Sequence, residues 1–344
     1  MPIADCLLIS ADSHIIEPPM MLKERVPAQF RDAAPEFPAL KVGDGFQTQP
    51  GGSDPTKRLD EMTTDGVSAE VLYPTHLLSV FGMDDAKCQE ACFRAYNDWL
   101  AEYISVHPER LVGIGAISVY DIDQAVKELE RCKKMGMKGS IIWQAPHPDL
   151  PFSSTHYDKF WAASQDLAMP VSLHILTGHG YHKDPNFGKI RTVENYRTSV
   201  NIKILEIANA VFDILFTGVL ERFPRLKFVA AEWEIGWLAH WLQRLDHAFY
   251  RNRSAAHPDL NLRPTGYWKR QFYATFEDDK VGVITRNEIG LDTLMWGNDY
   301  PHHDSIWPNS PQVLDDIFTG VPEAARFAMT VGNVTKLYGL PVSE

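Results

Sequence analysis

The feature that most constrains the fold of this chain is a regular alternation of short apolar runs with longer segments of helical periodicity. The apolar runs predict buried strands, and the amphipathic segments between them predict crossover helices, which together indicate a parallel sheet. Eight such strands favour a closed barrel over an open doubly wound sheet. We therefore predict an α/β fold, a distorted (β/α)8 TIM barrel, whose strands are residues 6–11, 69–74, 111–117, 138–143, 170–174, 226–231, 271–276 and 293–297.

We expect residues 1–344 to form a single domain. The chain is 44% hydrophobic, which is ample for one large core, and no linker-like segment divides it. Two irregular insertions are predicted, one after the first strand at about residues 15–58 and one before the seventh strand at 253–269. The first is rich in proline and too poor in periodic apolar residues for a core of its own, so we expect it to lie over one mouth of the barrel.

Composition excludes several classes of function. A net charge of −12 argues against nucleic acid as a partner, because phosphate binding requires a basic face. No apolar run is long enough to span a membrane, and residues 1–6 lack the basic region of a signal peptide. The four cysteines form no Cys-x-x-Cys pair, which is typical of reduced thiols in a cytoplasm. We expect a cytoplasmic protein that acts on a small molecule.

Metal-competent side chains stand at the carboxyl ends of the predicted strands. In a barrel these ends form one rim, so residues far apart in the chain would converge there. Two imidazoles and up to three carboxylates on one rim would bury or repel charge unless a cation lay among them. Nitrogen and oxygen ligands without thiolate suit Zn²⁺, Mn²⁺ or Fe²⁺. The residues are Asp12 and His14 at the first strand, His174 at the fifth, Glu232 at the sixth and Asp299 at the eighth.

Each residue also has a plain structural interpretation. His174 could be a core histidine, Asp12 a turn residue, and Glu232 a carboxylate at a helix N-terminus. It is their joint placement at matching strand ends that favours a metal site. Four loop histidines are further candidates for substrate contacts, although a solvent-facing state is an alternative for them: His179, His182, His302 and His303.

Several of these motifs resemble the amidohydrolase superfamily, and specifically the amidohydrolase-2 group related to aminocarboxymuconate-semialdehyde decarboxylase. The resemblance covers nearly the whole chain and implies a distorted (β/α)8 barrel with a divalent metal. It implies metal ligands at Asp12, His14, His174 and Asp299, with Asp299 also the acid/base residue, and a homodimer. The motifs are Asp12-Ser13-His14 with Glu17-Pro18, His174 after an apolar strand, residues 218–227, Glu232 before Gly236-Trp237, and residues 296–302.

This chain departs from the family pattern at two positions. Better-known members carry His-x-His or Glu-x-His on the first strand, where this sequence has Asp12-Ser13-His14. The decarboxylases carry a catalytic histidine at the end of the sixth strand, where this sequence has Glu232. The site is therefore rich in carboxylate, a composition that could hold a second metal or prefer iron or manganese over zinc.

The leading functional prediction is metal-assisted hydrolysis of a small substrate. Asp299 would accept a proton from metal-activated water, and His179 or His302 would steady the developing oxyanion. The alternative is non-oxidative decarboxylation of an aromatic or enol carboxylate, with Asp299 protonating the ring carbon. Weaker alternatives are oxygen chemistry at a one- or two-iron site, suggested by Glu232, and a metal-free binding barrel.

The expected cofactor is one or two divalent ions, with zinc first and manganese or iron as alternatives. Aromatic residues in the insertions and loops favour an apolar, aromatic or cyclic substrate, although core or interface packing explains them equally well. These residues are Phe81, Tyr181, Tyr267, Trp268 and Trp307.

Overall fold

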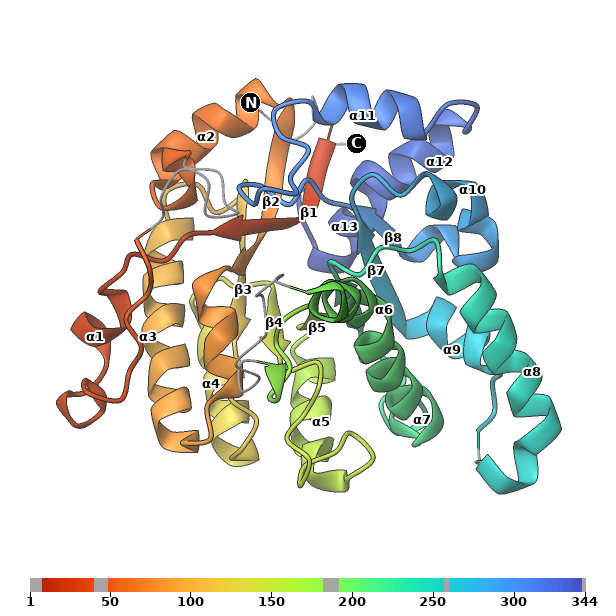
Figure 1. Ribbon diagram of the computed structural model, residues 1–344, viewed down its shortest axis with the longest axis horizontal. Helices are drawn as coiled ribbons and strands as arrows, with labels where there is room; N and C mark the ends of the chain where they lie inside the picture. Colours follow the sequence, from red (N-terminus) through yellow and green to blue (C-terminus); the bar gives the residue numbers. More distant parts are fainter. Residues whose placement is uncertain (1–7, 40–48, 182–191, 257–259, 342–344) are drawn as a thin grey trace.

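Eight parallel strands with intervening helices form a barrel in the computed structural model, which describes residues 8–39, 49–181, 192–256 and 260–341 (Figure 1). Each strand pairs with the next along the chain, and the predicted barrel is confirmed. Every strand lacks an exposed residue, as expected for a parallel sheet that is covered on both faces. The strands are β1 (Leu8–Ile15), β2 (Val67–Pro74), β3 (Leu111–Ala116), β4 (Gly139–Ile142), β5 (Val171–His174), β6 (Phe228–Ala231), β7 (Phe272–Phe276) and β8 (Leu294–Trp296).

The first strand is longer than predicted. It continues through Asp12 to Ile15, and Ser13 and His14 pair with Leu72 and Tyr73 of β2. The prediction ended this strand at residue 11 because polar residues follow, but the pairing with β2 overrides that local signal. The register shifts between Ser10 and Ser13, so this irregularity in the strand contains Asp12 itself and comes directly before His14.

Backbone hydrogen bonds beyond β8 close the barrel against β1. The Asp299 amide donates to the Asp12 carbonyl at 3.0 Å, and the His14 amide donates to the Tyr300 carbonyl at 2.6 Å. Gly297 permits this approach, since a Cβ there would lie 2.6 Å from Asp12 Cβ and 2.9 Å from the Asp12 amide nitrogen. The glycine therefore joins the first and last strands where both enter the site.

Helices cover the outside of the barrel, and aspartates cap several of them. Asp121 accepts the Gln124 amide at the start of α4, and Asp85 accepts the Lys87 and Cys88 amides at the start of α3. The helices are α1 (Met21–Arg25), α2 (Pro55–Thr64), α3 (Ala86–Ile104), α4 (Ile122–Lys134), α5 (Asp158–Asp166), α6 (Val193–Phe216), α7 (Val219–Arg222), α8 (Leu238–Ala256), α9 (Pro264–Gln271), α10 (Lys280–Ile289), α11 (Ser310–Ile317), α12 (Glu323–Phe327) and α13 (Asn333–Tyr338).

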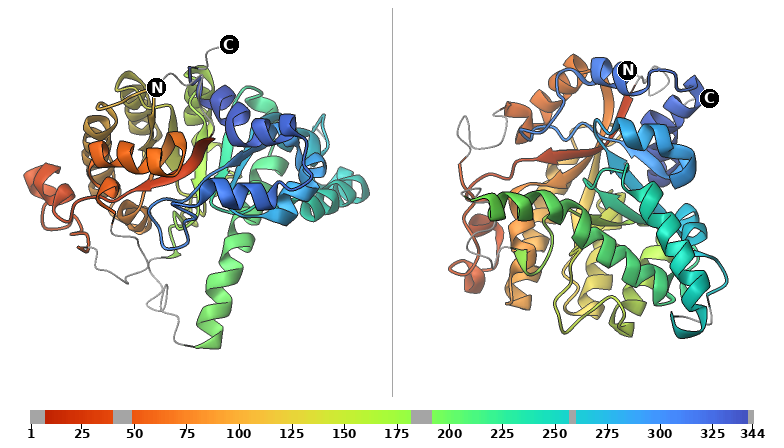
Figure 2. Two further views of the ribbon diagram at one scale, coloured as in Figure 1. Left: turned by 90° about the horizontal axis from the view of Figure 1, so that it is seen from above. Right: turned by 45° about the vertical axis from the view of Figure 1, so that its right-hand side comes forward.

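Two consecutive helices, α6 and α7, connect β5 to β6. Gly218, at φ 76°, separates α6 from α7 because only glycine adopts this left-handed conformation readily. The N-terminal part of α6 extends away from the barrel (Figure 2), and its Val193, Tyr196 and Leu205 side chains are exposed. No helix of the described residues is long and apolar enough to cross a membrane.

The two insertions contain short regular elements. In the first, α1 lies beside α3, where Arg25 forms two hydrogen bonds of 2.7 and 2.8 Å with Glu102 (Figure 1). The other end of this stretch returns to β1, where the Ile16 amide donates to the Gly52 carbonyl at 2.7 Å. The second ends in helix α9, whose Tyr267 and Trp268 are fully buried. Packing therefore accounts for these two aromatic residues, and also for Phe81, which is 1% exposed.

We predict that Gly297→Ala will disrupt the junction of β1 and β8. The added methyl group would overlap Asp12, and overpacking of this kind costs about 1–3 kcal/mol. Chemical denaturation should show lower stability, and metal affinity should fall because Asp12 is displaced. Gly332→Ala is the matched control, because its Cβ would meet its nearest neighbour at an ordinary 3.6 Å. Equal stability of the two variants would contradict the proposed role of Gly297.

Candidate metal centre

The centre is built around two histidines from opposite parts of the barrel. His14 lies on β1 and His174 is the last residue of β5, and both are fully buried. His14 Nδ1 is 2.8 Å from the Pro74 carbonyl oxygen, and His174 Nδ1 is 2.8 Å from the Ile175 carbonyl oxygen. Because a carbonyl only accepts, each Nδ1 carries the hydrogen, and each neutral ring presents its lone pair at Nε2. Holding the outer nitrogen in this way is how proteins orient metal-binding histidines.

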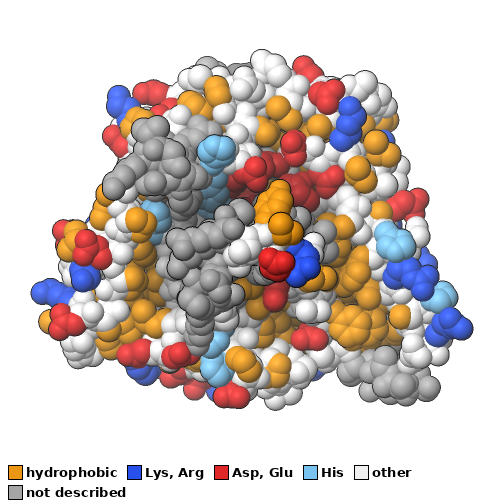
Figure 3. All heavy atoms as spheres, viewed as in Figure 1, with side chains coloured by type: hydrophobic (Ala, Val, Ile, Leu, Met, Phe, Trp, Pro, Cys, Tyr) orange, Lys and Arg blue, Asp and Glu red, His pale blue; other side chains and the backbone are white. Residues whose placement is uncertain are grey.

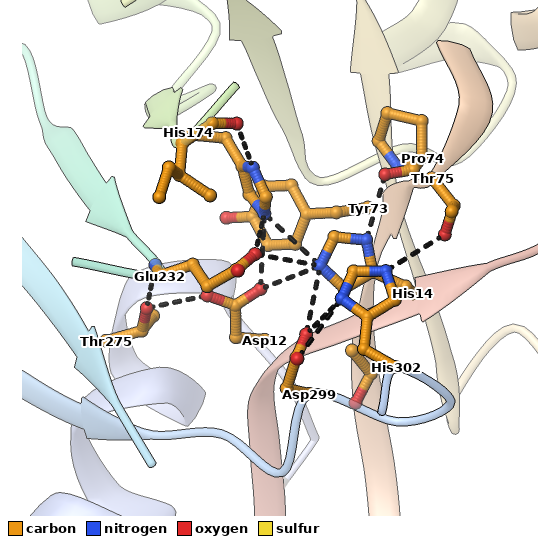
Figure 4. A network of polar contacts seen from close by, with 12 residues as sticks. Asp12, His14, Tyr73, Pro74, Thr75, His174, Glu232, Thr275, Asp299 and His302 are labelled. Atoms are coloured by element: carbon orange, nitrogen blue, oxygen red, sulfur yellow. Dashed lines mark hydrogen bonds and ion pairs between the residues drawn. The ribbon is translucent and has the colours of Figure 1, made fainter. Parts of the chain in front are cut away.

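The two Nε2 atoms face each other at 3.3 Å (Figure 4). Two lone pairs at this distance repel unless a proton or a cation lies between them. Ligands about 2.0–2.1 Å from a zinc ion at a tetrahedral angle would be separated by roughly 3.3 Å. The histidine pair therefore fits a single transition-metal ion.

Three carboxylates surround these nitrogens. Glu232 Oε2 lies 3.4 Å from His14 Nε2 and 3.3 Å from His174 Nε2, and Asp299 Oδ1 lies 3.3 Å from His14 Nε2. Asp12 Oδ1 lies 3.8 and 3.7 Å from the same two nitrogens. Asp12 Oδ1 and Glu232 Oε2 are buried and accept no hydrogen bond from the described residues. Buried oxygens left without donors suit a cation, so the donor set fits a divalent metal.

The acidic side chains also line a small cavity next to these residues. Its volume is about 10 Å³, roughly that of one water-sized probe, and its walls include Glu234 and Glu277 besides the three carboxylates above. Figure 3 shows acidic side chains gathered in the hollow on this face, with histidine beside them. Burial and the nearby Asp299 and Glu234 raise the pKa of Glu277 to about 11.

The histidines and Asp299 have strongly shifted pKa values. Burial, followed by the charges of His302 and His174, lowers the pKa of His14 well below its usual value. Burial also acts to lower the pKa of His174, but the nearby carboxylates of Asp12 and Glu232 outweigh it and raise that pKa to about 9. Burial, Glu232 and Asp12 raise the pKa of Asp299 well above the usual value of a carboxyl group. A divalent cation would favour neutral imidazoles and ionised carboxylates here.

Two of the carboxylates sit on strained backbone. Glu232 has φ 62° and Asp299 has φ 52°, in the left-handed region that costs about 1–2 kcal/mol for residues other than glycine. Such strain is found where a site requires one particular side-chain direction. Helix α8 begins at Leu238, so the structure does not support Glu232 as a helix N-terminal carboxylate.

Two polar residues that position the centre were missed in the sequence. Thr275 Oγ donates to Asp12 Oδ2 at 2.6 Å and accepts the Glu232 amide at 2.7 Å. The side-chain Oδ1 of Asn298 accepts from Ser13 Oγ at 2.8 Å and from Ser10 Oγ at 3.1 Å, linking β1 to the segment after β8. The sequence offered a signal for each residue. Thr275 is a polar residue within an otherwise apolar strand, and Asn298 directly precedes Asp299 in the chain.

The loop histidines lie in different places. His302 joins the centre, because its Nδ1 lies 2.9 Å from Asp299 Oδ1 and its ring centroid lies 3.9 Å from that of His14. His179 lies instead with Asp84 and His147, its Nε2 2.9 Å from Asp84 Oδ1. His303 is exposed, and His182 falls outside the described residues. The catalytic roles predicted for His302 and His179 stay predictions.

A family model described as amidohydrolase matches residues 11–340. The chain belongs to the amidohydrolase family. A gamma-resorcylate decarboxylase from Polaromonas sp. is 24% identical over 75% of this chain and 78% of its own length. A 2-amino-3-carboxymuconate-6-semialdehyde decarboxylase from Dictyostelium discoideum is 25% identical over 83% of this chain and 77% of its own length. These relatives within the amidohydrolase family are carboxy-lyases.

Solved structures share the fold of this amidohydrolase. An amidohydrolase from Mycobacterium avium subsp. paratuberculosis superposes with a TM-score of 0.81 at 17% identity, covering 96% of this chain and 99% of that one. A 5-carboxyvanillate decarboxylase from Novosphingobium aromaticivorans, complexed with manganese, gives a TM-score of 0.74 at 18% identity and covers 97% and 96%. The comparisons back the decarboxylase alternative better than the hydrolysis that the sequence placed first.

We predict that Thr275→Val will weaken metal binding. The substitution keeps the shape of the side chain but removes the hydroxyl that holds Asp12 and the Glu232 backbone. Loss of such a supporting hydrogen bond typically costs about 10–100-fold in metal affinity. Equilibrium dialysis against manganese would measure it, with Thr275→Ser, which retains the hydroxyl, as the control. Unchanged affinity in the valine variant would show that Thr275 has no part in orienting the ligands.

Proposed function

We propose that this protein is a metal-dependent, non-oxidative decarboxylase of a small aromatic carboxylate. The observation that carries the proposal is the buried Asp299 carboxyl group, which lies with His302 beside the two facing imidazoles. A carboxyl group in this position can hold a proton and deliver it to a bound substrate. The names of the relatives support the substrate class, since both act on unsaturated carboxylates.

The residues that would hold the metal are His14 and His174 through Nε2, with Asp12, Glu232 and Asp299 supplying oxygen. When bound, a divalent metal supplies Lewis-acid polarisation of the substrate's oxygens and fixes their orientation. We place manganese first, ahead of the zinc favoured by the sequence, because solved relatives of this fold contain it. Zinc and iron remain the alternatives for the resident ion.

The chemistry requires one proton. The bond from the ring carbon to the carboxylate breaks, carbon dioxide leaves, and the electron pair stays on the ring carbon. Asp299 then delivers its proton to that carbon. His302 Nδ1, 2.9 Å from Asp299 Oδ1, can return a proton to the carboxylate, and its Nε2 lies 3.3 Å from Thr75 Oγ on the way out of the centre.

Asp299 could also act as the general base of hydrolysis, because a bound cation would hold its carboxylate ionised. The names of the relatives are therefore what favours decarboxylation over hydrolysis. Oxygen chemistry would instead consume dioxygen. Carbon dioxide release, dioxygen uptake and cleavage of aryl esters or amides therefore distinguish the three reactions, with gamma-resorcylate and 5-carboxyvanillate as the first substrates to test.

We predict that Asp299→Asn will lower the decarboxylation rate by about 10²–10⁴-fold, because the amide cannot supply the proton. Carbon dioxide release would be followed together with metal content, which separates loss of the donor from loss of the ion. Asp304→Asn is the matched control, because Asp304 is exposed nearby, influences Asp299 through its charge, and is not one of the proposed metal ligands. A fully active Asp299→Asn enzyme with normal metal content would overturn the proposed mechanism.

We predict that Glu232→Gln will reduce metal content and turnover together, since Glu232 Oε2 faces both histidines. Elemental analysis after dialysis would measure the metal. The control is Glu288→Gln, on the exposed surface of α10. If metal content and turnover are both intact, Glu232 is not a ligand.

The homodimer expected from the family stays a prediction, which sedimentation of the purified protein would test.

A further inference from the structure

A second cavity lies at the opposite end of the barrel from the metal centre. Its volume is about 560 Å³, within the range of small-molecule sites. Its walls come from residues just before the strands: Pro170 precedes β5, Lys227 precedes β6 and Arg270 precedes β7. The metal centre is built at the carboxyl ends of β5 and β6 and of other strands, so the two sites are separated by the length of the barrel.

The charge of this cavity is opposite to that of the protein. The chain carries a net charge of −12, yet five cationic side chains line the cavity against two carboxylates, Asp166 and Asp292. Arg225 forms an ion pair with Asp166 at 2.7 Å, which accounts for one cation and one carboxylate. The other four cations are Lys227, Lys269, Arg270 and Lys336.

Three of these four are held by uncharged groups. Lys227 Nζ donates to the Arg270 carbonyl at 2.5 Å, and Lys269 Nζ donates to the Asn287 carbonyl at 3.3 Å. The Arg270 guanidinium donates to the Leu220 carbonyl at 2.7 Å and to the Gln271 side chain, also at 2.7 Å. Carbonyl oxygens fix the positions of the two lysines without neutralising them, so their positive charge stays available to a ligand, whereas the charge of Arg270 also acts on the Glu221 carboxylate.

The cations also act on one another. Lys227 is half-buried, and burial together with the charges of Lys336 and Arg270 lowers its pKa. Positive groups held this close in a partly desolvated cavity are stabilised by a bound anion. Apolar surface is present as well, because Met169, Tyr273 and Leu337 complete the lining.

We propose that this cavity binds a small organic oxyanion, one that carries a phosphate group or two carboxylates on an apolar or neutral body. The fixed ammonium and guanidinium groups would bind the oxyanion, and the apolar lining would contact the rest of the molecule. Because the cavity is remote from Asp299 and the histidines, the proposal is independent of the reaction catalysed.

The test is isothermal titration calorimetry of the metal-loaded protein with glycerol 3-phosphate and, separately, with succinate. Binding of either probe should weaken with added salt. Lys227→Gln and Lys336→Gln should each raise the dissociation constant about tenfold, as expected for loss of a hydrogen bond to a charged group. Which probe binds more tightly distinguishes a phosphate from a dicarboxylate ligand.

Lys159→Gln is the matched control, because it removes the same charge from an exposed lysine that pairs with Asp123 on the outer helices. The dissociation constant of each probe should be the same for Lys159→Gln as for the wild-type protein. An anomalous-scattering peak in the cavity of a crystal soaked in selenate would locate the anion site directly. The proposal is overturned if neither probe binds the wild type, or if both cavity variants bind as tightly as the wild type.

Discussion

The structure around the metal centre depends on an electrostatic conflict that the fold itself creates. The barrel brings His14 and His174 within 3.3 Å of each other and surrounds them with three carboxylates, all at the carboxyl ends of strands. Such a set is unfavourable for the apoprotein, as the opposite pKa shifts of the two histidines and the raised pKa of Asp299 illustrate. A divalent cation bound among these groups would make their close approach favourable. Its binding would therefore stabilise the folded protein.

Hydrogen bonds from neighbouring strands and loops fix the orientation of the side chains at the centre despite this repulsion. Carbonyl oxygens of Pro74 and Ile175 fix the imidazoles, and Thr275 holds Asp12 while binding the Glu232 amide. Arg58 adds a further restraint, donating to the His14 carbonyl at 2.5 Å while paired with the buried Glu70 at 2.5 Å. These bonds join β1 to β2 and to β7, and β7 to the residue after β6, so the geometry of the centre depends on an intact barrel.

Glu232 follows β6, at the position where the resemblance to the decarboxylases led us to expect a histidine. Glu232 faces the same nitrogens that a cation would use, on a left-handed backbone that a helix-capping residue does not need. An additional oxygen donor favours harder ions over softer ones. It also places a negative charge next to Asp299, which raises the pKa of the proposed proton donor.

The sequence by itself determined the barrel and most of the residues of the centre. Periodicity located all eight strands, because a strand buried on both faces appears as an apolar run, and polar residues at the ends of those runs stand out. Only the tertiary structure decided how those residues meet. The continuation of β1 through Asp12 and His14, the separation of His179 from His302, and the part played by Thr275 all depend on contacts between distant strands. The physical reason is that local sequence records burial and turn preference, whereas the direction of a side chain within a barrel is set by bulges, register and its neighbours across the sheet.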